Sequence, residues 1–390
     1  MLNALKFVHC ADIHLDAPFS ERSGEYSEAR RKDIRNAFMN ILNFVKEENA
    51  DLLLISGDLY EHRYITRKTM DWLHMVLAGV RVPVVIIPGN HDPYLVNSWY
   101  KNWDWPSNVN LLSPEHPHLV LEGKQVSLYG LGFSAFKEGK PDLSAVKPPQ
   151  QGYFNILMLH GTLDMDFTGE AYKPLTSEEL AGLGYDYYAL GHFHNMRTDY
   201  PLKNAANPGS PEPLGFDEPG VHGAFFVTLT AENKEVKAEI RRFDTAIRVY
   251  HEKTLDITGS RNLEEVKIRI LGLIEVLNPR RDLVRIVLKG RTDLGIEPRI
   301  LEEAYAEDWL YLKIKDETQK AFDMESLQKE PSLRGAFVRE IMGRIRLLEE
   351  NMGKSPPDKG LGQQKQQLEL ALVFGLEALQ DGKIEWWDEI

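Results

Sequence analysis

Short apolar runs, each followed by a turn that carries polar residues, recur through the first 230 residues of the chain. Such runs before Gly-containing turns are typical of strands buried on both faces of a sheet. The apolar residues from Ile34 to Val45 lie on one helix face, and residues 65–78 predict a second helix that stops at Gly79. Strands that alternate with helices predict a layered α/β sheet. The predicted strands are 5–10, 52–55, 82–87, 156–159 and 187–190.

Beyond about residue 230 the pattern changes to a small unit of alternating strands and helices, and beyond Pro331 to helices alone. Two long helices are expected over 332–352 and 362–380, and the segment between them has the Gly and Pro content of a linker. The cap is predicted to contain strands at 248–257, 283–289 and 309–315 and helices at 262–277 and 297–307. We therefore expect an α/β core over 1–230, a small α/β cap over 231–320 and a C-terminal helical arm over 321–390.

Composition narrows the class of protein. A chain of 390 residues is too long for one ordinary core, which fits this division. It carries 46 basic and 59 acidic residues, a net charge of −13, so binding to DNA would need a local patch, a bound metal or a partner.

A single cysteine, Cys10, excludes an intrachain disulfide and a Cys-rich zinc site and suits a reducing, cytoplasmic location. No apolar run is long enough to span a membrane, and the N-terminus does not resemble a signal peptide.

The polar clusters all follow predicted strands. In a parallel sheet the carboxyl ends of the strands form the ligand-binding edge, so we expect these side chains to converge although they are far apart in sequence. Each cluster alone has an ordinary structural interpretation, such as a helix cap or a turn with exposed histidines. Five clusters in order, each after a strand, favour a shared site. The candidates are Asp12, His14, Asp58, Asn90, His91, His160, His192 and His194.

The residue types in this set indicate metal chemistry. Imidazole, carboxylate and amide oxygen without thiolate suit Mn²⁺, Fe²⁺ or Zn²⁺. Eight groups are too many for one ion and suit two ions about 3.5–4 Å apart that share a carboxylate and act on a phosphate ester. Asp58 is the natural bridging ligand of such a pair.

With these motifs the chain resembles the calcineurin-like metallophosphoesterases. Within them it resembles the bacterial DNA-repair nuclease subunits of the SbcD and YhaO type, in the stretches 7–16, 57–60 and 207–211. The resemblance implies a layered core of two sheets flanked by helices. The motifs that carry it are Asp12-x-His14, Gly57-Asp58, Gly89-Asn90-His91-Asp92, His160 and Gly191-His192-x-His194.

The resemblance also implies a role for each candidate. His91 would be catalytic without binding metal, because the matching histidine of the family faces the scissile phosphate and acts on the leaving oxygen. Mn²⁺ is the metal that the family prefers. One ion would be held by Asp12, His14, Asp58 and His194, and the other by Asp58, Asn90, His160 and His192.

The implied function is a metal-dependent DNA nuclease, an exonuclease or endonuclease of DNA repair. Family members act as homodimers, with an SMC-like ATPase docked on the C-terminal helices. A small-molecule phosphodiesterase and a scaffold for the ATPase are the alternatives. One departure is Glu61, since family members often carry a histidine three residues after the bridging aspartate, and here His62 follows it.

Three further features have two interpretations each. The aromatic cluster from Trp99 to Trp105 could stack on bases or pack a loop onto its domain. The basic stretch from Arg30 to Arg35 could contact phosphates or form a solvated helix face. The two C-terminal helices could form a self-contained hairpin or dock on a partner, with Trp386 and Trp387 contributing in either case.

Overall fold

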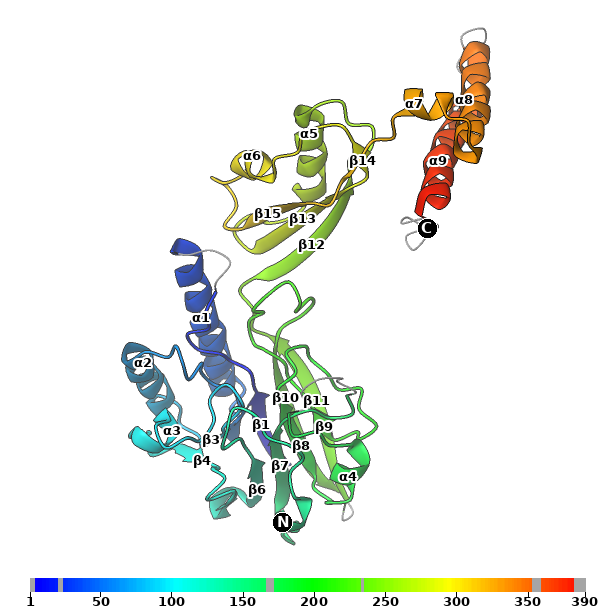
Figure 1. Ribbon diagram of the computed structural model, residues 1–390. Helices are drawn as coiled ribbons and strands as arrows, with labels where there is room; N and C mark the ends of the chain where they lie inside the picture. The colour runs from blue at the N-terminus through cyan, green and yellow to red at the C-terminus, as the bar shows by residue number, and fades with distance from the viewer. Residues whose placement is uncertain (1–3, 20–23, 166–171, 233–234, 353–358, 382–390) are drawn as a thin grey trace. The chain divides into compact units, whose positions relative to one another are not determined.

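The structure, a computed structural model, describes residues 4–19, 24–165, 172–232, 235–352 and 359–381 (Figure 1). The chain divides into two compact units, here called the core unit and the C-terminal unit. The core unit comprises Met1–Thr254, Ile270–Val287 and Glu297–Lys315, and the C-terminal unit comprises Leu255–Arg269, Leu288–Ile296 and Asp316–Ile390.

A six-stranded sheet forms the first layer of the core unit. Four of its strands run parallel, from β1 to β4, and helices α1 and α2 make two of the crossovers that parallel pairing requires. The antiparallel hairpin of β10 and β11 extends the sheet beyond β1, so this layer continues past residue 230. The order is β11 (Glu235–Asp244), β10 (Gly223–Glu232), β1 (Ala4–Cys10), β2 (Leu52–Ser56), β3 (Val84–Ile87) and β4 (Val109–Leu111).

A five-stranded sheet forms the second layer. A hairpin forms one edge of this sheet, since β5 pairs antiparallel with β6 across a short 3-10 turn, η1 (Glu122–Lys124). The remaining pairs are parallel. The order is β5 (His118–Leu121), β6 (Val126–Leu131), β7 (Phe154–His160), β8 (Tyr187–Gly191) and β9 (Ala205–Ala206).

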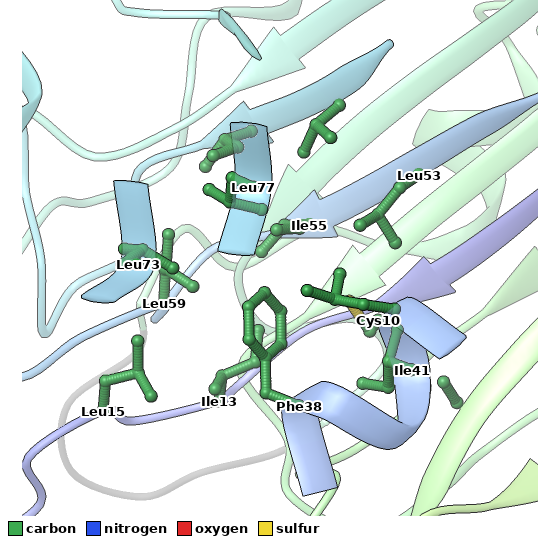
Figure 2. Packing of buried hydrophobic residues seen from close by; sticks show 14 of the residues in the cluster. Cys10, Ile13, Leu15, Phe38, Ile41, Leu53, Ile55, Leu59, Leu73 and Leu77 are labelled. Atoms are coloured by element: carbon green, nitrogen blue, oxygen red, sulfur yellow. The ribbon is translucent and has the colours of Figure 1, made fainter. Parts of the chain in front are cut away.

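Apolar side chains on both faces of the central strands build the core. Alternate residues of β2 point to opposite faces, so Leu52 and Leu54 pack between the two sheets while Leu53 and Ile55 face helices α1 (Glu25–Glu47) and α2 (Arg67–Ala78). This double burial explains why the strands read as continuous apolar runs. Figure 2 shows the helical side, where Phe38, Ile41, Leu73 and Leu77 meet Cys10, Leu53 and Ile55.

The helix boundaries follow local capping. Helix α2 begins at Arg67, two residues after the predicted start, because Thr66 is extended and its hydroxyl accepts from the Thr69 amide at 3.2 Å. It ends at Gly79, as predicted. On the outer face of the second sheet, Leu180 of the short helix α4 (Ser177–Ala181) packs with Leu157 and Tyr188.

Residues beyond 245 contain the small α/β elements that the sequence predicted. A three-stranded sheet has the order β12-β13-β15, and a two-stranded one joins β14 to β16. None of the described helices of the whole chain is both long and apolar enough to cross a membrane. The elements are β12 (Val249–Asp256), α5 (Leu263–Ile274), β13 (Asp282–Lys289), β14 (Arg291–Thr292), α6 (Pro298–Glu303), β15 (Leu312–Asp316) and β16 (Gln319–Lys320).

The C-terminal unit ends in two long helices, α8 (Leu333–Met352) and α9 (Lys359–Asp381), preceded by α7 (Met324–Lys329). Their buried core is small: Leu327, Val338, Leu372 and Leu376, with Phe337 and its neighbours partly buried around it. The helices approach closely at Gly375, where an added Cβ would collide with the Phe337 ring. Most of the predicted linker and the two terminal tryptophans, residues 353–358 and 386–387, lie outside the described residues.

The predicted fold class is therefore confirmed: an α/β core of two sheets flanked by helices, with further small α/β elements and C-terminal helices. The division into three domains at residues 230 and 320 stays a prediction.

Candidate metal centre

The predicted ligands lie where five strands end, namely β1, β2 and β3 of the first sheet and β7 and β8 of the second. Backbone hydrogen bonds join the first two of these loops, from the Asp12 amide to the Gly57 carbonyl at 3.1 Å and from the His14 amide to the Asp58 carbonyl at 3.0 Å. The polar side chains therefore meet because parallel strands place their carboxyl ends at one edge.

The backbone is bent sharply at these positions. Asp12, His14 and Asp58 have φ near +50°, and His192 has φ 101°, all in the left-handed region that costs about 1–2 kcal/mol for a residue with a side chain. Gly57 also has positive φ, and a Cβ there would collide with the His160 ring. Non-glycine residues in this region are uncommon, and four ligand candidates share it.

The first cluster consists of Asp12, His14 and His194, whose ligand atoms lie within 4.8 Å of one another. Nδ1 of His14 lies 2.8 Å from a Glu61 oxygen, and Nδ1 of His194 lies 2.6 Å from a Glu218 oxygen. Each carboxylate holds a proton on Nδ1, so in the neutral rings both Nε2 atoms carry lone pairs, and these face each other at 3.1 Å. Two opposed lone pairs are unfavourable without a cation between them, so the donor set fits a metal ion.

The second cluster consists of Asp58, His160 and His192, with Asn90 beside them. Nδ1 of His160 donates to the Ser56 carbonyl at 2.8 Å, which leaves Nε2 facing Asp58 Oδ2 at 3.2 Å and Asn90 Oδ1 at 3.0 Å. The same amide oxygen lies 3.0 Å from Nδ1 of His192. Oxygen and nitrogen lone pairs again converge, which suits a second divalent ion.

Asp58 lies between the clusters. Its Oδ2 is 3.2 Å from His160 Nε2 in one cluster and 3.7 Å from His14 Nε2 in the other. Burial alone would raise the pKa of Asp58, but the adjacent His160 and His14 hold it well below its ordinary value. The carboxylate is thus kept ionised, as a ligand shared by two cations must be.

Burial and neighbouring carboxylates shift the pKa values of two histidines of the site. Burial lowers the pKa of His160, but Asp58 raises it to about 9. Burial likewise lowers the pKa of His194, and the hydrogen bond to Glu218 raises it to about 9. Protonation and metal binding are therefore alternative ways to balance the negative charge at this edge.

His91 belongs to neither of these clusters, but its ligand atom lies within 4.8 Å of those of His14 and Glu61, which form a third group with it, and its side chain is 45% exposed. Its amide donates to Asp58 Oδ1 at 2.7 Å, and its Nδ1 lies 3.1 Å from Glu61. Burial lowers the pKa of His91, and the hydrogen bond with Glu61 raises it to about 9. The ring of His91 is thus an exposed imidazole beside the candidate ligands.

Three carboxylates of the site escaped the sequence analysis as functional residues. Glu61 and Glu218 orient His14 and His194 as described above. Asp92 accepts hydrogen bonds from the amides of Leu59 and Gly89, at 2.7 and 2.6 Å, and thereby fixes the loop after β2 to the loop after β3. Two of the three had a signal in the sequence, Glu61 as the departure from the family pattern and Asp92 as the last residue of a family motif, whereas Glu218 had none.

The weaker sequence features have structural explanations. Trp99, Trp103 and Trp105 are partly buried against the core, which favours packing over base stacking. Arg30 fits neither interpretation of the basic stretch, because it is fully buried and pairs with Asp33 and Glu212 at 2.9 and 2.5 Å. The ring of His62 lies against that of Phe136, with centroids 5.8 Å apart.

Comparisons with known proteins agree with this geometry. The sequence pattern of the calcineurin-like phosphoesterase family matches residues 5–196, which contain every predicted ligand. The chain is 28% identical over 365 residues to the uncharacterized metallophosphoesterase YhaO of Bacillus subtilis (strain 168), covering 86% of this chain and 87% of that protein. It is 24% identical over 369 residues to the DNA double-strand break repair protein Mre11 of Methanopyrus kandleri, covering 84% and 76%.

Among solved structures, TT1561 of Thermus thermophilus aligns with 61% of this chain and 99% of its own length, at 9% identity and a TM-score of 0.36. The family assignment rests on the sequence matches and the convergent ligand set. Residues 5–196 of the chain form a calcineurin-like phosphoesterase domain, and the chain resembles the YhaO and Mre11 proteins over most of its length.

Proposed function

We propose that this protein is a DNA nuclease that hydrolyses phosphodiester bonds with two divalent cations, Mn²⁺ in preference to Fe²⁺ or Zn²⁺. The observation that carries the proposal is the pair of clusters of candidate ligands described above. Asp58 lies between the two clusters, and the exposed His91 lies beside them. Paired divalent ions neutralise a phosphodiester and polarise its P–O bonds. The first ion would be held by Asp12, His14, Asp58 and His194, and the second by Asp58, Asn90, His160 and His192.

The protein's own groups would then position the reaction. Because Nδ1 of His91 is engaged by Glu61, its Nε2 is the atom available to a substrate. In that place it would donate a proton to the leaving oxygen, a contribution that is typically worth about 10²–10⁴-fold in rate.

Two observations support DNA as the substrate. One relative is named a DNA double-strand break repair protein, although its identity to this chain is only 24%. Next to the His91 loop, the exposed Arg63 lies over the ring of Phe136, 5.4 Å from its centroid, and Phe136 is itself 37% exposed. A cation and an aromatic ring at the rim suit a nucleic-acid backbone and base.

Because the chain has a net charge of −13, we expect it to bind DNA weakly without a partner. We propose that an SMC-like ATPase is this partner and docks on the C-terminal helices, in the cytoplasm and with the nuclease as a homodimer. The exposed Leu333, Leu347, Leu370 and Leu379 on these helices are the kind of anchors that a partner helix would cover.

The test is Mn²⁺-dependent cleavage of end-labelled linear duplex and single-stranded DNA, with bis-p-nitrophenyl phosphate run alongside. Asp58→Ala removes the shared ligand and serves as the blank, and Asp71→Ala, an exposed aspartate of α2, is the matched control. Cleavage that is lost only in Asp58→Ala supports the proposal. Hydrolysis of the small diester with intact DNA, even after the ATPase is added, would indicate a small-molecule phosphodiesterase instead. No turnover of either substrate would favour a scaffold.

A further inference from the structure

Glu61 contacts two histidines that have different roles in the proposed function. One oxygen lies 2.8 Å from Nδ1 of His14, a metal-ligand candidate, and Nδ1 of His91 lies 3.1 Å from either oxygen. The two imidazole rings meet edge to face, with centroids 4.8 Å apart. One carboxylate therefore fixes the orientation of both rings.

The backbone around Glu61 is held from both sides. Its own amide donates to the Leu15 carbonyl at 3.0 Å, next to His14, and the following amide, of His62, donates to the His91 carbonyl at 3.0 Å. The side chain is 13% exposed and so has little freedom to turn away. Glu61 is thus anchored to the very loops whose histidines it contacts.

From this arrangement we infer that Glu61 is a positioning residue that couples the orientation of the catalytic imidazole of His91 to the metal ligand His14. The inference rests on the proposed function, since it assigns those two roles to the histidines. A carboxylate can accept from both Nδ1–H groups at once. A glutamine amide has only one acceptor oxygen, so one ring would lose its partner or change tautomer.

Glu218 provides the matched control within the same site. It binds Nδ1 of His194 in the way that Glu61 binds Nδ1 of His14, but the structure gives it no contact with His91 among the described residues. A role confined to orienting a ligand would make the two carboxylates equivalent. The proposed coupling predicts that they differ.

The experiment compares full-length wild type, Glu61→Gln, Glu218→Gln, His91→Ala and the double variant Glu61→Gln/His91→Ala. Mn²⁺ affinity is measured by calorimetry, and kcat and KM for bis-p-nitrophenyl phosphate are measured over a range of Mn²⁺ concentrations. Melting temperatures without metal report whether each variant is folded.

Both glutamine variants are expected to bind Mn²⁺ about 10–100-fold more weakly, the usual effect of removing such a carboxylate. Saturating Mn²⁺ should then restore turnover in Glu218→Gln, whereas Glu61→Gln should keep a kcat about 10-fold or more below wild type with little change in KM. The residual loss should vanish in the background of His91→Ala, because the ring that Glu61 positions is gone.

Two results would overturn this inference without affecting the proposed function. One is a fall in the kcat of Glu61→Gln that saturating Mn²⁺ restores to the wild-type value. The other is a fall in kcat that multiplies with the fall caused by His91→Ala in the double variant. If Glu218→Gln did not fold, the kcat values of Glu61→Gln, His91→Ala and the double variant would still test the inference. A wild-type protein that hydrolyses no diester would overturn the proposed function, and this inference with it.

Discussion

The metal-ligand edge of the core unit and the helical hairpin of the C-terminal unit are built in opposite ways. At the ligand edge Asp12, Asp58 and His160 are almost fully buried and their polar atoms have partners from distant parts of the chain. In the hairpin four apolar residues form the buried core, while leucines such as Leu347 remain exposed. Chemistry needs groups held within fractions of an ångström, whereas a docking surface needs apolar area left uncovered.

Among variants that keep the candidate ligands, the largest effect is expected at the ligand edge, from His91→Ala. Turnover of bis-p-nitrophenyl phosphate at saturating Mn²⁺ should fall about 10²–10⁴-fold, because the proton donor to the leaving oxygen is lost. Calorimetry should show Mn²⁺ affinity close to that of wild type. The exposed His116→Ala is the control, and a His91→Ala protein that no longer binds Mn²⁺ would mean that this histidine is a ligand.

Asp92→Asn is expected to lower the stability of the fold, because Asp92 holds together two loops of the same edge. The Asp92 carboxylate also accepts from the Tyr100 hydroxyl at 2.6 Å, and an asparagine would turn an N–H group toward donors. We expect the free energy of unfolding to fall by about 3 kcal/mol, measured by urea denaturation. The exposed Asp142→Asn should change it by less than about 0.5 kcal/mol, and equal losses in both variants would contradict the assigned role.

In the hairpin, Leu376→Ala should lower stability by about 2 kcal/mol, since a fully buried leucine leaves a cavity in a small core. Hydrolysis of the small diester should be unchanged, because the ligand edge has its own packing. Leu379→Ala, at a position 41% exposed, is the control. A matching loss of diester turnover in Leu376→Ala would show that the two regions are not independent.

The smallest effect on the fold is expected from Leu347→Ser combined with Leu370→Ser, at positions 62% and 49% exposed. Each change should alter stability by no more than about 0.5 kcal/mol. Co-purification with the SMC-like ATPase should nevertheless be lost, and the exposed Ile300→Ser of α6 should retain it. Undiminished binding by the double variant would place the docking surface elsewhere.

The convergence of the candidate ligands could be predicted because each follows an apolar run, and parallel strands bring such positions to one edge. Asp12 follows β1 and Asp58 follows β2 in this way. The carboxylates that orient the ligands could not be predicted by the same reasoning. Glu218, for example, lies in a loop 24 residues after its partner His194, with no periodic pattern to mark it.

Long-range pairing limits prediction of the fold in a similar way. The sequence shows an alternation of apolar residues at Val236, Ala238 and Ile240, which is typical of a strand. Only the structure shows that the hairpin of β10 and β11 continues the first sheet, through the pairing of Ala4 with Thr230. Arg30 belongs to a cluster of charges in the sequence, yet its partner Glu212 is 182 residues away. A buried ion pair of this kind leaves no local signal.

The spread of the ligand set along the chain also bears on how the protein is made. His14 and His194 are separated by 180 residues, so at typical rates of synthesis roughly 10–40 s pass between them. Strand β1, which carries the first ligands, meets its partner β10 only when residues up to Glu232 exist. A polypeptide that ends before His194 would therefore lack a complete candidate centre, and one that ends before Gly223 would lack the strand that pairs with β1.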